Sequence, residues 1–227
     1  MFKLNYIDLP QLETVETDNG RFYRPKGSTQ DIQYPSVTTI LGADPEKKAK
    51  IDAWRKRVGE EEANRISLQA TTKGTAVHSL IEAYIQNQEL PESMPHEYEA
   101  FLLLKDKVDK YVDNIRCIES RMLSHHLKVA GTVDCVAEYR GTLSIIDWKT
   151  SSRMKKKEWI DSYFMQGAAY SVMFEENTGI PVPQIVIVMA CATGQCQLFI
   201  EKRDDWIDKF KVQRANYDTL TEAGWIK

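Results

Sequence analysis

The 227-residue sequence has few cysteines, no long apolar run and no obvious targeting segment. Its four cysteines form no C-x-x-C pair, so an iron–sulfur or zinc site is poorly supported and buried free thiols are expected. No apolar run approaches the roughly 20 residues of a membrane span. The acidic N-terminus lacks the apolar stretch of a signal peptide. We therefore expect a cytoplasmic protein without a membrane partner. The cysteines are Cys117, Cys135, Cys191 and Cys196.

The chain also has little net charge, formally −3, so no general attraction to nucleic acid follows from it and any such binding needs local basic patches. There is no internal repeat and no low-complexity segment. Composition and length indicate one domain with a substantial core. We expect residues 1–227 to form this single domain. Its parts are an N-terminal hairpin annex (1–33), a helical part (34–113), a catalytic sheet core (114–202) and a C-terminal helix (203–227).

The first half of the sequence predicts a hairpin followed by helices. Asp18-Asn19-Gly20 is a strong turn signal between two short alternating runs. Asp44 and Pro45 suit the start of a helix that continues to about residue 69, with a basic first half. A second helix is predicted to begin at Thr71 or Thr72 and to carry His78 beside its apolar face. A third is expected over residues 96–112.

The stretch from Val129 to Ser151 predicts two strands joined by a tight turn at Arg140-Gly141. Residues two apart on a strand point to the same face, so Asp147 and Lys149 should share one space. A paired strand can bring Asp134 to the same place. Buried charges of this kind are costly unless a metal or a substrate phosphate completes the site.

These residues, with His78 and Glu119, suit a hard divalent cation such as Mg²⁺ or Mn²⁺. Such an ion can polarise a phosphodiester, and Lys149 could orient or deprotonate the attacking water or stabilise developing charge. The spacing alone is modest support, because two acids and a lysine meet by chance in many sheets. A lone histidine beside an apolar stripe is also more often a packed residue than a ligand.

The ordered motifs resemble the PD-(D/E)XK nuclease superfamily, in its RecB-like exonuclease branch. The resemblance extends to the mitochondrial genome-maintenance exonuclease group and its phage relatives, and covers about residues 34–200. The set is specific, although each piece alone is weak. The motifs are Gly131–Asp134, Asp147–Ser151, Gln166 with Tyr170, Gly74–His78, and Pro35–Leu41 as the opening segment.

The resemblance implies an α/β fold with a restriction-endonuclease-like αβββαβ core, a mixed central sheet, flanking helices and the small N-terminal β-hairpin annex. It implies metal ligation by His78, Asp134, Asp147 and the carbonyl of Trp148. Lys149 would be the catalytic lysine, and Glu119 an assisting acid whose phase on its strand is uncertain. A phage-encoded protein would work in the cytoplasm of a bacterial host.

The resemblance implies DNA as the partner, with replication or recombination proteins as possible further partners. Tyr34, Trp54 and Trp159 could stack bases, but the core is the expected place for each. The leading hypothesis is a metal-dependent DNA exonuclease that prefers single strands or free ends. A structure-selective endonuclease and a non-catalytic DNA-binding module remain alternatives. The predicted DNA contacts are Ser36, Thr38, Thr39, Thr150, Ser151, Gln166, Tyr170, Lys155, Lys156, Lys157 and the basic half of the helix from Asp44.

Overall fold

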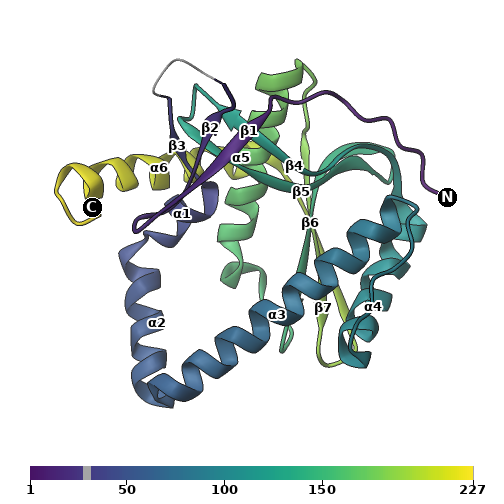
Figure 1. Cartoon of the computed structure of the whole chain (residues 1–227), viewed down its shortest axis with the longest axis horizontal. Helices are drawn as coiled ribbons and strands as arrows, with labels where there is room; N and C mark the ends of the chain where they lie inside the picture. The colour runs from purple at the N-terminus through teal and green to yellow at the C-terminus, as the bar shows by residue number, and fades with distance from the viewer. Residues whose placement is uncertain (28–31, 227) are drawn as a thin grey trace.

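A computed structural model describes residues 1–27 and 32–226 (Figure 1). Residues 28–31 of the expected annex and residue 227 of the expected C-terminal helix lie outside the described residues. Strands β1 (Leu12–Thr17), β2 (Gly20–Pro25) and β3 (Tyr34–Pro35) form a small antiparallel sheet in that order. The turn between β1 and β2 ends at Gly20, which has a φ of 114°, a value that glycine adopts at little cost. The predicted N-terminal hairpin is confirmed.

The central sheet contains five strands in the order β4-β5-β6-β7-β8. Only the β6–β7 pair is parallel, and the crossover helix α5 connects these two strands. With α4 before the sheet, this gives the expected αβββαβ order followed by one added strand, and the predicted mixed α/β fold is confirmed. The bounds are α4 (Pro95–Tyr111), β4 (Val112–Ser124), β5 (Val129–Tyr139), β6 (Thr142–Ser151), α5 (Asp161–Thr178), β7 (Gln184–Cys191) and β8 (Cys196–Lys202).

The turn between β5 and β6 is formed by Arg140 and Gly141, as predicted. Both have positive φ, 53° and 78°, which matches the twist that two-residue hairpin loops require. The turn fixes the register in which Tyr139 faces Thr142 and Cys135 faces Ile146.

Helices cover both faces of the central sheet (Figure 1). On one face, Leu80 of α3 and Phe101 of α4 belong to the same core cluster as Trp148. On the other, α1 (Val37–Gly42), α5 and α6 (Ile207–Glu222) pack together. Every residue from Ile185 to Cys191 is buried, as expected for a strand with both faces covered.

The helical part differs from the prediction in where it breaks. Helix α2 (Pro45–Val58) ends at Gly59, which has φ 91° and ψ 147°, and α3 runs unbroken from Glu60 to Ile85. The predicted helix start at Thr71 or Thr72 is therefore wrong. Threonine costs only about 0.7 kcal/mol or less inside a helix, so two threonines do not end a helix whose neighbouring turns are favourable.

Residues 45–72, here called the arm, lie mostly outside the core. Helix α2 has no buried residue, and Ala63 is the one buried residue in the described part of α3 before Val77. Figure 1 shows α2 and the first turns of α3 extending away from the sheet. No helix among the described residues is long and apolar enough to cross a membrane.

Candidate active site

The site forms where β5 and β6 stop pairing. Their ladder ends at Cys135 and Ile146, although β6 stays paired with β7 as far as Ser151. The backbone N–H and carbonyl of Trp148 are therefore not paired with β5 and bind side chains instead. Its N–H donates to Asp134 Oδ2 at 3.0 Å, and its carbonyl oxygen lies 2.7 Å from His78 Nε2. A carbonyl can only accept, so Nε2 carries the proton in this contact.

Three elements bring His78, Glu119 and Asp134 together. His78 Nδ1 lies 3.6 Å from Asp134 Oδ2 and 3.9 Å from Glu119 Oε1. One ligand atom from each of the three residues lies within 4.8 Å of the other two. Helix α3, strand β4 and strand β5 each supply one of them. The predicted grouping of these three residues is observed.

The backbone explains why the phase of Glu119 was hard to predict. Ile118 faces Cys135 and Ser120 faces Val133, which leaves Glu119 opposite Asp134. Glu119 has a φ of 43°, in the left-handed region that costs a non-glycine residue about 1–2 kcal/mol. Simple alternation along the strand does not apply at such a residue.

Asp147 and Lys149 form a tight ion pair, as their spacing predicted. Lys149 Nζ donates to Asp147 Oδ1 at 2.8 Å and lies 2.6 Å from Oδ2. Asp147 is 2% exposed, and this burial raises its pKa to about 6 even though the lysine charge opposes the shift. Burial acts to lower the pKa of Lys149, but the charges of Asp147 and Asp134 outweigh it and raise that pKa. In this state Lys149 is a cation rather than a base.

For His78, as for Lys149, burial and the neighbouring carboxylates shift the pKa in opposite directions. Burial acts to lower the pKa of His78, but the nearby carboxylates of Glu119 and Asp134 outweigh it and raise the pKa to about 9. The imidazolium is thus the preferred form beside two carboxylates. A histidine that ligates a metal must be neutral, so an ion at this position would take the place of that proton.

The donor set fits a hard divalent cation. Asp147 Oδ2 is buried and accepts no hydrogen bond, although a lysine nitrogen is near it. The Lys149 ammonium is the cation that offsets this buried charge in the structure. With Asp134, the Trp148 carbonyl and His78, Asp147 offers the oxygen-rich ligands that Mg²⁺ and Mn²⁺ prefer. Asp147 is not one of the three residues whose ligand atoms lie within 4.8 Å of one another.

A hollow of about 400 Å³ leads to this cluster. Glu82 lies one helical turn after His78 and was not among the predicted site residues. Burial and the charge of Glu119 raise the pKa of Glu82. Tyr163 was missed altogether, although it lies one turn before Gln166 on α5, and its ring centroid is 5.1 Å from Lys149 Nζ. The hollow is lined by Gly74, Thr75, His78, Ser79, Glu82 and Glu119.

Gln166 and Tyr170 lie together beside the site, as predicted. Gln166 Nε2 donates to Tyr170 Oη at 3.2 Å, and burial raises the pKa of the tyrosine, which therefore stays neutral. Gly131 explains the close approach of this ring to β5. A Cβ at position 131 would lie 2.7 Å from the ring, which no side chain permits without movement. The close approach of Tyr170 therefore explains why position 131, in the Gly131–Asp134 motif, is a glycine.

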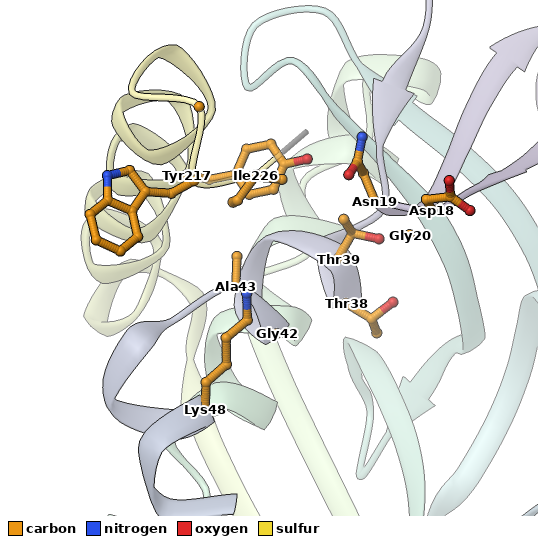
Figure 2. A pocket seen from close by; sticks show the side chains of 12 residues that line it. Asp18, Asn19, Gly20, Thr38, Thr39, Gly42, Ala43, Lys48, Tyr217 and Ile226 are labelled. Atoms are coloured by element: carbon orange, nitrogen blue, oxygen red, sulfur yellow. The ribbon is translucent and has the colours of Figure 1, made fainter. Parts of the chain in front are cut away.

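The hydroxyl residues of the opening segment have mainly structural contacts. Ser36 is 2% exposed and caps α1 by accepting from the Thr39 N–H at 2.9 Å, so its predicted DNA contact is not supported. Thr39 Oγ1 also donates to the Arg21 carbonyl. Thr38 and Thr39 line a separate hollow of about 630 Å³ beside Asn19 and Tyr217, shown in Figure 2. That hollow shares no residue with the one around His78.

Five further predicted DNA contacts lie in the last two residues of β6 and in the loop after it. Thr150 and Ser151 line a groove of about 760 Å³ together with Leu68, Lys73 and Met94. The side chain of Gln197 binds both the N–H and the carbonyl of Lys155, at 2.7 and 2.9 Å. Lys156 and Lys157 are exposed.

The expectation that aromatic residues Tyr34, Trp54 and Trp159 belong to the core is wrong for Trp159, which is 55% exposed. Tyr34 and Trp54 are half-buried. Trp159 lies in a short 3₁₀ turn that precedes α5. The apolar character of tryptophan does not show that this turn is exposed rather than packed against the sheet.

Comparison with known families decides the fold family. The profile of the PD-(D/E)XK nuclease superfamily matches residues 94–219, more than half of the chain. The chain belongs to this superfamily. The match includes Asp134, Asp147 and Lys149, which are the acids and lysine that the predicted motifs placed in the site.

Individual relatives of this nuclease domain include mitochondrial genome maintenance exonuclease 1 from three vertebrates. The human protein is 29% identical over 173 residues, covering 70% of this chain and 50% of the relative. The Xenopus tropicalis protein is 30% identical over 176 residues, covering 70% and 49%. The mouse protein is 31% identical over 128 residues, covering 53% and 38%. The chain thus spans half or less of the length of these relatives.

Among solved structures, a candidate exonuclease from Eubacterium rectale aligns with a TM-score of 0.46 and 15% identity, covering 68% of this chain and 69% of that one.

Proposed function

We propose that this nuclease domain is a divalent-metal-dependent DNA exonuclease that acts on single strands or free ends. The observation that carries the proposal is the arrangement around the Trp148 backbone. Asp134 and His78 bind its N–H and carbonyl, and the Asp147–Lys149 pair lies on the adjacent residues. The vertebrate relatives, which are named as exonucleases, support the same reading.

Each residue has a distinct role in the proposal. Asp134, Asp147, the Trp148 carbonyl and His78 would hold the ion, which polarises the phosphodiester and lowers the pKa of a bound water. Lys149 keeps its ammonium form beside two carboxylates and donates to the oxygen that gains negative charge. Glu119 adjoins His78 and assists in holding the ion. Gln166 and Tyr170 form the wall beside Gly131 and keep bulk water from that side.

The arm supports DNA as the substrate. Helix α2 carries several cationic side chains, and none of its residues is buried. Among the described residues, no acidic group lies within ion-pair distance of Lys47, Lys48, Lys56 or Arg57. Unpaired surface cations of this kind attract a phosphate backbone, and their contribution falls as salt rises.

The test is cleavage of end-labelled linear single-stranded, linear duplex and circular single-stranded DNA in Mg²⁺ or Mn²⁺. We expect linear single strands to be degraded and circles to be spared. Lys149→Ala should reduce turnover at least about 100-fold while DNA binding is kept. Asp134→Asn and Asp147→Asn should abolish cleavage. Lys211→Ala, which removes an exposed lysine of α6, serves as the matched control.

Each alternative result has a definite meaning. Cut circles would identify an endonuclease on the same fold. Binding without cleavage of any substrate would favour the non-catalytic DNA-binding module. Full activity in either aspartate variant would contradict the assignment of the metal ligands.

A further inference from the structure

Trp159 is a large aromatic side chain in an exposed position next to the site. It ends the 3₁₀ turn Lys157–Trp159 between β6 and α5, and it is 55% exposed. Its neighbour Ile160 is 1% exposed and packs in the cluster around Phe164. The chain thus buries the smaller residue and leaves more than half of the larger aromatic side chain accessible to a ligand.

Two cations lie near the ring of Trp159. Lys156 Nζ is 5.5 Å and Arg153 Cζ is 5.8 Å from the ring centroid. From residue 153 to residue 161 the sequence has four cationic side chains and two carboxylates, so the segment is net positive. Glu158 is only 4.0 Å from Lys156, but both side chains are 67% exposed and solvent screens their attraction.

Several contacts hold the backbone segment that carries Trp159. The backbone N–H of Trp159 donates to the Lys156 carbonyl at 3.0 Å. Gln197 on β8 fixes the backbone of Lys155 through two hydrogen bonds. Lys157 is paired with Glu201 at 2.6 Å. Because this backbone is already ordered, a ligand that stacks on Trp159 needs to order only the side chain itself.

The ring is also connected to the catalytic residues. The Tyr163 N–H donates to the Ile160 carbonyl at 2.8 Å, which places Tyr163 one turn after Trp159. The Tyr163 ring centroid is in turn 5.1 Å from Lys149 Nζ. Trp159 therefore lies in the turn that leads directly into α5, the helix that carries a neighbour of the catalytic lysine.

We propose that Trp159 stacks on an unpaired base of the DNA strand whose phosphate occupies the catalytic site, while Arg153 and Lys156 bind flanking phosphates. An exposed aromatic ring beside cations is the usual platform for single-stranded nucleic acid, because every base offers a π-face. Bases inside a duplex are already stacked, so the platform selects single strands. The inference rests on the proposed function and names the basis of its strand preference.

The test measures binding of a labelled oligothymidine and of a duplex of equal length, in EDTA so that cleavage cannot interfere. Trp159→Ala should weaken single-strand binding about 5- to 150-fold, the range for losing one stacked base, and leave duplex binding unchanged. Trp159→Phe should restore most of the affinity. Trp225→Ala is the matched control, because Trp225 is 82% exposed at the other end of the chain and should have no effect.

The phosphate contacts have a separate readout. Replacing Arg153 and Lys156 together by alanine should lower the slope of log affinity against log salt by about 1.4, since each phosphate contact to a single strand contributes about 0.7. Replacing Lys110 and Lys211, exposed lysines on α4 and α6, should lower it less.

The results separate this inference from the proposed function. If wild-type protein cleaves DNA in Mg²⁺ or Mn²⁺ but Trp159→Ala binds single strands normally with an unchanged melting temperature, the inference is wrong and the function stands. If nothing is cleaved but single-strand binding depends on Trp159, the platform stands and the nuclease proposal fails. Equal losses on single strands and duplex would also overturn the inference, because stacking predicts a difference between them.

Discussion

The two halves of α3 differ although they form one unbroken helix. Its first half, up to residue 72, has one buried residue, Ala63, among those described. Its second half buries Val77, Leu80 and Ile81 against the sheet and presents His78 to the Trp148 carbonyl. Continuity of a helix is therefore no guide to what each part does. One half carries a residue of the candidate site, and the other half projects with α2 as the arm.

The comparison predicts its largest effect at His78, the residue through which the packed half contacts the site. Loss of a residue that only orients a metal ligand commonly costs 10–100-fold, so for loss of a ligand itself we expect His78→Ala to lower cleavage at least about 100-fold or to change the preferred metal. The measurement is cleavage rate across Mg²⁺ and Mn²⁺ concentrations. His126→Ala, an exposed histidine, is the control. An unaltered metal profile would show that His78 is not a ligand.

Two leucines on the same helix test the difference in packing directly. Leu80 is 1% exposed and Leu68 is 69% exposed. Leu80→Ala should lower the free energy of unfolding by about 2–5 kcal/mol, because it leaves a cavity in the core. Leu68→Ala should change it by no more than about 0.5 kcal/mol. Urea denaturation measures both, and equal losses would show that the arm packs more tightly than its exposure indicates.

The smallest expected effect is on the arm itself. Replacing Lys47, Lys48, Lys56 and Arg57 by alanine should reduce the salt dependence of single-strand binding by up to about 3 in slope, at about 0.7 for each contact. Stability should change little, because α2 has no buried residue. Alanine at Lys107 and Lys110 of α4 is the control. An unchanged slope would remove the arm from the DNA-binding surface.

Much of the site was predictable because its signals are local. The turn at Arg140-Gly141 sets the register of β5 and β6, and that register brings Asp134 near Asp147. The spacing of Asp147 and Lys149 then gives their shared face. The helix N-cap at Asp44 and the hairpin turn before Gly20 were equally local and equally correct.

What the sequence could not show depends on tertiary context. Gly74 lies inside a helix and Gly59 ends one, although both are glycines in polar surroundings. Glu119 adopts a positive φ that no residue pattern announces. Trp159 is 55% exposed while the adjacent Ile160 takes the buried position, and the sequence alone does not show how this turn is oriented against the core.

The unbroken course of α3 also gives the arm and the site one common helical phase. Each residue of an α-helix adds about 100° of rotation and about 1.5 Å of length. One residue inserted between Leu68 and His78 would swing the arm by about 100° around the helix axis, whereas seven would return it to within about 20° of its direction and carry it about 10 Å farther out. The number of residues between Gly59 and His78 therefore sets where the arm points as well as how far it reaches.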